Sequence, residues 1–477
     1  MSRATWRKLI NWPEFRVVKS GALILASKWV LPITSPPIYD GAVLVRGNTI
    51  ASVGKRKETV KDNPHEDVRD FGEAVLLPGF VNAHTHLEIT AFRGIEDDLP
   101  LLPWITDAIN KAEKNLDHED FVISTSLGCL EALKSGITCV ANAGTRQARG
   151  GSFMAIVDSG LRGVFYQELW DGFKRDPDEV LEEVLSLVKE MQRSGSKRVE
   201  VGISPHSPYS VSKELFKLIN KTSLKMGLPL CTHLAESNEE VKFLMHGSSE
   251  IADFWRKEGV KWKAPRLTPV QYLDKLGVLN SNVLAAHCVH LTNEDIKILA
   301  KRRVAVAHCP KSNAKLGDGI APVPKLIDAG IRVGLGTDST ASNNVLDMFE
   351  EMRFAIFIQR ALHQTAPLLN AKQVLEMATI EGAKALGMES EIGSLERGKK
   401  ADVIAVALGG AHTTPLYDPT STLVYCAHQI DVTFVMVDGK IVVDDSEVKT
   451  LDEQKILKNV GRFKSKLEGA KSLKTQR

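Results

Sequence analysis

The sequence carries little net charge and lacks any long apolar run. Its 477 residues include 61 Lys and Arg against 59 Asp and Glu, which gives a net charge of +2. This balance argues against nucleic acid or an anionic membrane as a partner, because both bind proteins with a clear excess of basic residues. No stretch approaches the roughly 20 apolar residues that a membrane span needs. The N-terminal segment also lacks the apolar centre of a secretion signal, so we expect a cytoplasmic protein.

Cysteine is scarce as well. Six Cys occur, and none forms the C-x-x-C pair that is typical of structural zinc sites and redox motifs. Most stand in apolar, strand-like runs, which predicts small buried side chains in a reducing compartment. With 43% hydrophobic and 25% charged residues, the composition is that of an ordinary globular protein. The length allows one large domain and a smaller one.

The segment LLPGFVNAHTHLEIT, residues 76–90, places titratable side chains in a stretch that otherwise looks built for burial. Alternate residues of a strand share a face, so His84, His86 and Glu88 are expected on the same side. Burying three titratable groups together is costly. A divalent metal ion offsets this cost, because it binds neutral imidazoles and carboxylates. The pattern predicts a metal site whose remaining ligands come from elsewhere in the chain.

Strand-like and helix-like segments alternate through the middle of the chain. Residues 176–194 and 213–225, for example, have the apolar spacing of amphipathic helices. Eight such alternations predict an α/β fold, a (β/α)8 TIM-type barrel. The expected strands are 80–86, 137–143, 162–168, 199–206, 228–233, 283–287, 304–308 and 332–338.

Histidines and an aspartate stand where the expected strands end. In a barrel of this kind the catalytic groups come from the C-terminal ends of the strands, which open on one face. Random placement of 13 His would rarely put so many there, so the pattern itself predicts an active site on that face. The residues are His84, His86, His206, His233, His287, His308 and Asp338.

Both ends of the chain have the sequence pattern of a small β-sheet. Short strand-like runs alternate with Gly and polar residues, and Asp438-Gly439 is a hairpin signal. We expect a small β-sandwich domain formed by residues 1–75 and 393–450 around a barrel of residues 76–392. Residues 451–477 are rich in Lys, which predicts a C-terminal helix or tail at the surface.

Five motifs make the sequence recognisable. The chain contains, in this order, PGFVNAHTH, THLAE, AAHCVHL, HCPKSNAKLGDGIAPV and GTDSTASNN. Together they resemble the amidohydrolase superfamily, and within it the branch of cytosolic deaminases and chlorohydrolases. That branch includes methylthioadenosine/S-adenosylhomocysteine deaminases and aminofutalosine deaminases. The resemblance covers nearly the whole chain, because a split β-sandwich at both ends is also a feature of this branch.

The resemblance implies a role for most of the strand-end residues. Glu236 would shuttle protons, while His287 and Asp338 orient the attacking water. His206 would contact the substrate. Binuclear relatives need a carbamylated Lys at the end of strand 4, where this chain has Pro205-His206, so one divalent metal ion is expected, with zinc favoured by family habit and iron as the alternative. The implied metal ligands are His84, His86, His233 and Asp338.

Substrate recognition is where the sequence departs from this branch. Methylthioadenosine/S-adenosylhomocysteine deaminases carry an acidic residue just before a Trp in the loop after strand 1, and this residue holds the ribose hydroxyls. Here Pro103 precedes Trp104. We therefore expect Trp104 to contact the substrate and Glu88 to replace the missing acid. The alternative for Glu88 is an exposed ion pair.

An inserted segment, residues 246–269, separates strands 5 and 6. Its Gly, Pro and Trp residues suit a loop-and-helix lid near the mouth of the site. Its basic residues Arg256, Lys261, Lys263 and Arg266 would let such a lid bind a carboxylate-bearing substrate. Each of them is also, by itself, typical of a solvated surface.

The sequence thus predicts a metal-dependent hydrolytic deaminase that acts on carbon–nitrogen bonds of an amino-substituted heterocycle. The expected substrate is a small molecule, a 6-aminopurine nucleoside such as aminofutalosine, S-adenosylhomocysteine, methylthioadenosine or adenosine. A triazine chlorohydrolase or aminohydrolase, or a guanine-type deaminase, is the alternative. A non-catalytic protein of the same fold is the remote alternative. Dimers are common in this branch, which adds a homodimer as the assembly to test.

Overall fold

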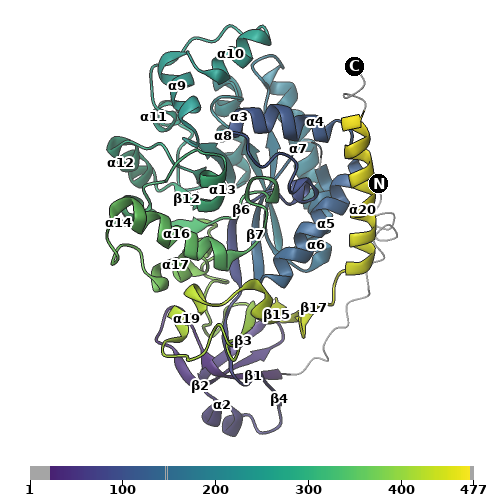
Figure 1. Ribbon diagram of the computed structural model, residues 1–477, viewed down its shortest axis with the longest axis vertical. Coiled ribbons are helices and arrows are strands. Elements are labelled where there is room, and N and C mark those ends of the chain that lie inside the picture. Colours follow the sequence, from purple (N-terminus) through teal and green to yellow (C-terminus); the bar gives the residue numbers. More distant parts are fainter. Residues whose placement is uncertain (1–21, 146, 148, 473–477) are drawn as a thin grey trace.

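A barrel and a smaller mixed sheet make up the computed structural model, which describes residues 22–145, 147 and 149–472. The barrel and its helices form the upper part of Figure 1, and the small sheet lies below it. Purple and yellow strands lie together in the small sheet, so both ends of the chain contribute to it. This arrangement confirms the expected fold class.

Eight parallel strands form the barrel, in the order in which they occur in the sequence. All the expected strands are present, with small shifts at their ends. The strands are β6 (Phe80–Thr85), β7 (Ile137–Gly144), β8 (Arg162–Leu169), β9 (Val199–Pro205), β10 (Leu230–Leu234), β11 (Val283–His287), β12 (Ala305–His308) and β13 (Val333–Leu335).

The first and last strands of the barrel meet at a parallel bridge between Thr85 and Asp338. The amide of Asp338 donates to the carbonyl of His84 at 2.9 Å. The hydroxyl of Thr85 donates to the carbonyl of Asp338 at 3.0 Å. The bridge therefore closes the barrel at its C-terminal face, beside residues that the sequence predicts as metal ligands.

Small apolar side chains fill the barrel interior below this face. Val81, Ala83, Ala141, Ala305 and Ala307 belong to one buried cluster. They alternate with outward-facing residues along their strands, as the pleat requires. This apolar cluster fills the barrel beneath the polar residues at its C-terminal face.

Strands from both ends of the chain combine in the second sheet. β5 pairs with β14 antiparallel, with Leu77 opposite Ile404, and this pairing joins the two pieces. Asp438 and Gly439 have φ of 51° and 73°, the left-handed backbone that a two-residue hairpin needs. The strands are β1 (Ala22–Val30), β2 (Ile38–Arg46), β3 (Thr49–Lys55), β4 (Asp67–Asp70), β5 (Ala74–Pro78), β14 (Val403–Ala407), β15 (Val432–Val437), β16 (Lys440–Asp444) and β17 (Glu447–Val448).

Two helices illustrate how the sequence sets helix ends. α7 (Pro177–Gln192) begins after Asp176, whose carboxylate accepts from the amides of Asp178 and Glu179, and it has Pro at its first position. α8 (Lys213–Met226) ends at Gly227 with φ of 67°, a left-handed cap that Gly adopts without strain.

The remaining helical elements cover the barrel and connect its strands, and three belong to the small sheet region. No helix among the described residues is long and apolar enough to cross a membrane. The elements are α2 (Arg56–Asp62), η1 (Leu87–Phe92), α3 (Leu101–Pro103), η2 (Trp104–Ile109), α4 (Asn110–Glu113), α5 (His118–Lys134), α6 (Arg149–Ser159), α9 (Asn238–His246), α10 (Glu250–Lys257), α11 (Pro269–Lys275), α12 (Asn293–Arg302), α13 (Pro310–Lys315), α14 (Val323–Asp328), α15 (Thr340–Asn343), α16 (Met348–His363), α17 (Ala371–Met377), α18 (Ile380–Ala385), α19 (Pro419–Tyr425), η3 (Gln429–Asp431) and α20 (Glu453–Ser472).

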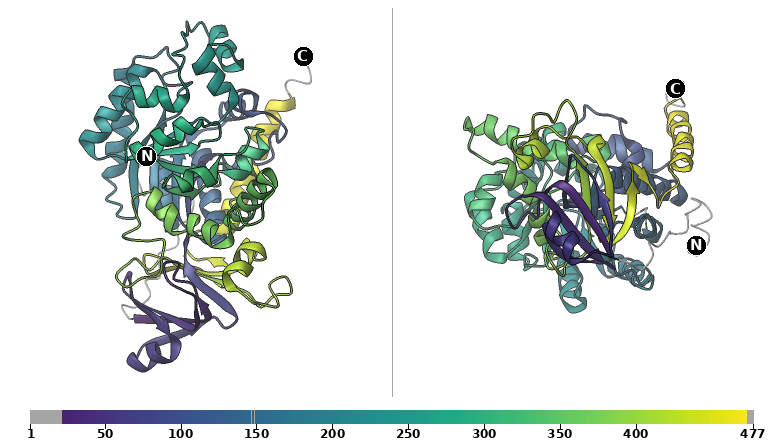
Figure 2. Two further views of the ribbon diagram at one scale, coloured as in Figure 1. Left: turned by 90° about the vertical axis from the view of Figure 1, so that its left-hand side faces the viewer. Right: turned by 90° about the horizontal axis from the view of Figure 1, so that it is seen from below.

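The C-terminal helix α20 lies along the flank of the barrel, as Figures 1 and 2 show. It buries Ile456 and Phe463, and Lys466 pairs with Asp117 and Asp120 at the start of α5. The helix is therefore at the surface, but its apolar side packs on the protein.

The inserted segment 246–269 contains α10 and is attached to the barrel through two tryptophans. The indole N–H of Trp255 donates to the carbonyl of Tyr209 at 2.6 Å. The indole N–H of Trp262 donates to the carbonyl of Phe243 at 3.1 Å. These contacts hold the segment against the loop that follows β9 and against α9.

A buried ion pair connects the barrel to the small sheet. Arg162, at the start of β8, is 3% exposed, and its Nε lies 2.8 Å from the Asp402 carboxylate. Its guanidinium also approaches Asp438 at 3.4 Å. Asp402 accepts a further hydrogen bond from the amide of Asp438. The guanidinium thus spans the junction between the two sheets.

We expect Asp402→Ala to lower the free energy of unfolding by about 3 kcal/mol, because it leaves a buried guanidinium without its main partner. Glu73→Ala is the matched control, since the pair of Glu73 with Lys28 is exposed and such pairs contribute about 1 kcal/mol or less. Urea denaturation measures both. A loss at Asp402 no larger than that at Glu73 would contradict the structural role of the buried pair.

Candidate active site

Donor atoms from three strands converge at the C-terminal face of the barrel. His86 Nε2 and His233 Nε2 are 3.2 Å apart. Asp338 Oδ1 lies 3.6 Å from His86 Nε2 and 3.7 Å from His84 Nε2. All four side chains are buried. The structure therefore brings together the four residues that the sequence predicts as metal ligands.

Neighbouring groups orient these donors by binding their outer atoms. His233 Nδ1 lies 3.0 Å from the carbonyl of His206, and His86 hydrogen-bonds the backbone of Ala143. When Nδ1 carries the proton, the Nε2 lone pair faces the centre. Asp338 Oδ2 accepts from the hydroxyls of Ser312 and Ser342 at 2.6 and 2.7 Å, which leaves Oδ1 directed at the imidazoles.

The protonation states suit a metal ion. Burial lowers the pKa of His84, His86 and His233, so these imidazoles are neutral and can act as ligands. Within the described part of the chain, the buried Nε2 of His84 has no hydrogen-bond partner. Orphaned polar atoms of this kind are costly in a protein interior. A divalent cation would satisfy them, so the donor set fits the expected metal.

Glu236 and His287 form a second pair beside the four donors. Glu236 Oε1 lies 3.4 Å from His287 Nε2, and His287 Nδ1 lies 2.8 Å from Asn313 Oδ1. Burial, and after it the nearby carboxylates of Asp338 and Glu240, raises the pKa of Glu236 well above its usual value. A carboxyl of this kind can carry a proton at neutral pH and pass it on.

Several residues around the site have a backbone conformation that L-amino acids rarely adopt. Ala235, His287, Cys288 and Asp338 have φ of 52°, 71°, 51° and 56°. Each left-handed residue costs about 1–2 kcal/mol, and such strain gathers at functional sites. The sequence carries no signal for it, since none of these residues is Gly or Asn.

His206 follows β9 and borders the same space. Its Nδ1 shares a hydrogen bond of 2.7 Å with the Ser210 hydroxyl, and its ring centroid lies 4.9 Å from that of His233. Burial lowers the pKa of His206 to about 3. Its predicted contact with the substrate stays a prediction, although its place beside the metal-site histidines suits that role.

Glu88 does not lie where the strand pattern predicts it. β6 ends at Thr85, and Glu88 belongs to the short helix η1, so it does not continue the strand face of the two histidines. It is fully buried, which makes the alternative of an exposed ion pair wrong. Its Oε1 accepts from the Asn142 amide at 2.8 Å. Burial raises its pKa to about 8.

Trp104 lies in η2, above the loop that follows β6. It packs against an apolar cluster that includes Ile89, Phe92, Ile109 and Phe121. The sequence alone gives no hint of this packing, because the partners come from three separate elements. Contact of Trp104 with a substrate stays a prediction.

Sequence reasoning missed several supporting residues. Ser312 and Asn313 orient Asp338 and His287, and both stand in the motif HCPKSN. Glu240 accepts from the amides of Ala235 and Glu236 and so fixes the turn after β10. The motif offered a signal for the first two, whereas Glu240 looks like any acidic residue of a helix.

A cavity of about 270 Å³, here called the mouth pocket, lies next to these residues. Loops and short helices after β6, β9, β10, β11 and β12 enclose it, and its lining includes Leu101, Ile105, Tyr209, Ser237 and Asp318. Ser237 directly follows Glu236 in the chain. The described metal-site residues do not line the pocket, which adjoins them through Ser237 and through Tyr209, whose ring lies 5.6 Å from that of His206.

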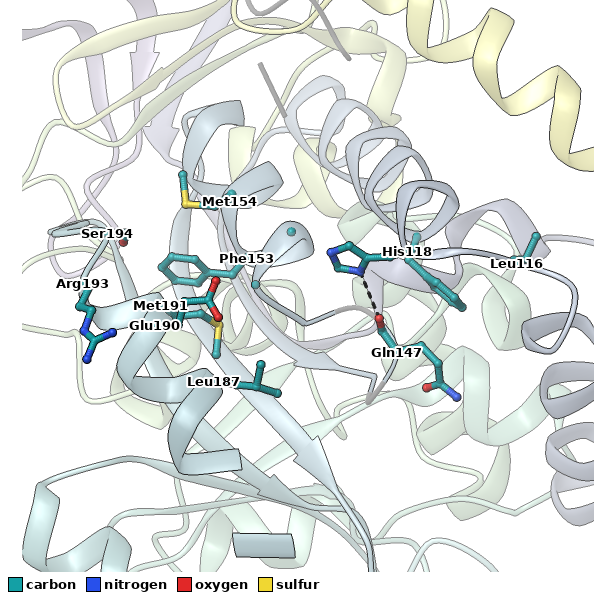
Figure 3. Close-up of a pocket in the computed structure, with 13 residues that line it drawn as sticks. Leu116, His118, Gln147, Phe153, Met154, Leu187, Glu190, Met191, Arg193 and Ser194 are labelled. Carbon is teal, nitrogen blue, oxygen red and sulfur yellow. Dashed lines mark hydrogen bonds between the residues drawn. The ribbon is translucent and has the colours of Figure 1, made fainter. Parts of the chain in front are cut away.

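A larger hollow of about 830 Å³ lies on the flank of the barrel, between α5, α6 and α7. Figure 3 shows His118 bonded to the carbonyl of Gln147 on one side of it and Phe153, Met154 and Leu187 on the other. Of the described site residues, none lines this hollow. Its lining presents no convergent set of metal ligands, so size alone does not mark the reaction centre.

Comparison with known proteins agrees with this geometry. The model of the amidohydrolase family matches residues 75–442. The 5-methylthioadenosine/S-adenosylhomocysteine deaminase of Moorella thermoacetica is 38% identical over 440 residues, which are 92% of this chain and 98% of that protein. The 5′-deoxyadenosine deaminase of Methanothermobacter thermautotrophicus is 37% identical over 447 residues, 92% of this chain and 98% of that protein.

A solved structure is similar over almost the whole chain. An adenosine deaminase from Xanthomonas campestris with bound zinc superposes with a TM-score of 0.84 and 30% identity. The match covers 94% of this chain and 98% of that one. The likeness includes both the barrel and the small sheet.

We expect Glu88→Gln to change stability in a pH-dependent way. Because burial raises the folded-state pKa from 4.5 to about 8, the protonated carboxyl stabilises the fold below pH 4.5, and this contribution is lost as pH rises through 8. Gln keeps an acceptor for Asn142 without a charge. The melting temperature of the variant relative to wild type should therefore rise between pH 5.5 and 8.5, with Glu294→Gln on exposed α12 as control. A constant or falling difference would refute the buried charge.

Proposed function

Since the chain belongs to the amidohydrolase family, we propose that it deaminates a 6-aminopurine nucleoside by hydrolysis. The observation that carries the proposal is the convergence of His84, His86, His233 and Asp338 beside the Glu236–His287 pair. The similar proteins named for adenosine, 5′-deoxyadenosine and methylthioadenosine deamination support this substrate class.

His84, His86, His233 and Asp338 would hold one divalent cation, which when bound lowers the pKa of a ligated water to near neutrality. We infer zinc, because the similar adenosine deaminase holds zinc and the donor set of imidazoles and one carboxylate suits it. Iron remains the alternative. Pro205-His206 ends β9, so the chain lacks the Lys that a bridged second metal would need there.

Glu236 is the proton carrier in this mechanism. As a carboxylate it accepts a proton from the attacking water, and it delivers that proton to the purine ring nitrogen beside the reacting carbon. Attack on that carbon makes it tetrahedral. The proton that remains on the added hydroxyl then passes to the amino group, the carbon–nitrogen bond breaks, and ammonia leaves as the hydroxyl oxygen forms a carbonyl with the carbon.

His287 and Asp338 position the water. Asn313 fixes the Nδ1 proton of His287, so Nε2 faces the reacting atoms and can hydrogen-bond the nucleophile. Asp338 is held by Ser312 and Ser342, which keeps one oxygen free on the same side. The burial of all three groups strengthens these interactions, because little water competes with them.

Other features of the proposal rest on the sequence and its resemblance. The substrate contacts assigned to His206, Glu88 and Trp104, the homodimer and the cytoplasmic location stay predictions. A non-catalytic protein is disfavoured, because every group that the reaction needs is present in a suitable arrangement.

The decisive experiment is ammonia release by the purified protein, with its metal content measured in the same sample. The panel contains adenosine, 5′-deoxyadenosine, methylthioadenosine, S-adenosylhomocysteine, aminofutalosine, guanine and a chlorotriazine. We expect at least one adenine nucleoside to exceed guanine and the triazine by about 100-fold in kcat/KM. Turnover of guanine or the triazine alone would favour the alternative enzymes. No ammonia release from any of the nucleosides, in protein that holds about one metal ion per chain, would reject the proposal.

We expect Glu236→Gln to lower kcat by about 1,000-fold, because it removes the group that transfers the proton. The variant should keep its metal, since Glu236 is not among the four donors. Glu214→Gln, on the exposed side of α8, is the control. Elemental analysis and steady-state kinetics measure the two properties. A variant with more than a tenth of wild-type kcat would exclude Glu236 as the proton carrier.

A further inference from the structure

Two residues that line the mouth pocket are neighbours of residues of the reaction centre. Ser237, which directly follows Glu236 in the chain, lines the pocket. Tyr209 also lines it, and the centroid of its ring lies 5.6 Å from that of His206. A purine whose reacting carbon lies against the metal-site residues would therefore direct its ribose or the group beyond it towards this space. The chemistry of the lining then decides which of these groups is accepted.

Asp318 is the unusual residue of this lining. Its side chain is 7% exposed, and its buried Oδ2 has no hydrogen-bond partner among the residues that the structure describes. Its backbone is fixed on both sides: the carbonyl binds His290 Nε2 at 2.7 Å, and the amide donates to the carbonyl of Asn313 at 2.8 Å. The backbone thus holds an unpartnered carboxyl at the pocket wall.

No Lys or Arg belongs to the described lining of the mouth pocket. The nearest cation along the chain, Lys315, is already bound by Asp97 and Asn344. Lys242 pairs with Glu239, so the charge of that lining residue is compensated as well. Glu250 also lines the pocket, but its side chain is exposed at the start of α10, so Asp318 is the buried acid that the pocket contents would meet.

The basic residues of the inserted segment do not alter this balance. Arg256 pairs with Asp253 and is mostly exposed. Lys261, Lys263 and Arg266 are exposed too, and none of the four lines the pocket. The structure therefore gives no support to a carboxylate-binding lid formed by these residues.

A second acid borders the site near His206. Glu168, at the end of β8, is 4% exposed. One of its oxygens lies within 4.8 Å of a ring nitrogen of His206 and of His233. It does not line the mouth pocket, and burial raises its pKa well above the usual value, which disfavours its charged form. Glu168 therefore does not supply the charge that a group in the pocket would meet.

From these observations we infer that Asp318 selects nucleosides whose group beyond the purine is uncharged or cationic and rejects those that place a carboxylate there. The inference rests on the proposed function and narrows its substrate class. A carboxylate in the mouth pocket would lose its hydration and meet an acidic wall without a cation to pair with. A hydroxyl, amide or ammonium group would instead donate a hydrogen bond to the carboxyl.

The test compares two substrates that differ only in this charge, adenosine 5′-carboxylate and adenosine 5′-carboxamide. Assays at about pH 9, above the pKa of about 8 to which burial raises Asp318, keep that group ionised. We expect wild-type kcat/KM to favour the carboxamide by at least tenfold. Asp318→Asn should reduce this ratio at least fivefold. Glu294→Gln, on the outside of α12, should leave the ratio unchanged.

The outcomes separate the two claims. Ammonia from neither compound, nor from adenosine, would reject the proposed function and the inference with it. Ammonia from both at equal kcat/KM would reject the inference and leave the function standing. A wild-type preference that survives in Asp318→Asn would show that other groups select the charge and would reject the inference. Metal content and thermal melting are measured for each variant, so that only folded protein with bound metal is compared. The wild-type preference for the carboxamide tests the inference by itself, without any variant.

Discussion

The bridge between Thr85 and Asp338 sets the geometry of the whole site. It joins the first and last strands of the barrel, which lie far apart in the sequence, and it does so at the residues that carry the metal-ligating side chains. A rotation of β13 relative to β6 would separate Asp338 from His84 and His86, because the same backbone hydrogen bonds hold both. Closure of the barrel and assembly of the site are therefore one event. The strained φ of Asp338 is tolerated because the bridge, Ser312 and Ser342 hold the residue from three directions.

Burial of ionisable side chains is the second constraint on the site. It destabilises the arrangement that the bridge between Thr85 and Asp338 holds together. The site concentrates ionisable groups that the small apolar interior of the barrel cannot solvate, so burial lowers the pKa of the imidazoles and raises the pKa of the Glu236 and Glu168 carboxyls. Proteins accept such destabilisation where the altered protonation is used in chemistry. Neutral imidazoles can bind a cation, and a protonated carboxyl near neutrality can transfer a proton. The same low polarity makes a wrong charge in the mouth pocket expensive.

The regular part of this structure is readable from the sequence. Alternating strands and helices and the histidines at strand ends predict the barrel and the group of site residues, because strand periodicity and the common direction of the strands do not depend on detail. The parts that could not be predicted lie just beyond the strands. Glu88 leaves the strand pattern because the chain turns into η1 after His86. Asn313 in α13 and Asp318 in the loop after it gain their roles from an arrangement that only the closed barrel defines. Trp104 packs in a cluster drawn from separate elements, which no local pattern encodes.

The pairing of β5 with β14 has a consequence for how the chain is made. β5 is synthesised before any barrel strand, whereas β14 follows all of them. During translation the N-terminal strands of the small sheet therefore have an unpaired edge at β5 until β14 is synthesised. Unpaired strand edges of this kind readily pair with other chains. The barrel can form before β14 is synthesised. Arg162 at the start of β8 is then in place before Asp402 has left the ribosome. The last strands to emerge complete both the sheet and the ion pair, so a protein truncated before β14 would keep its catalytic residues and still carry an unprotected edge.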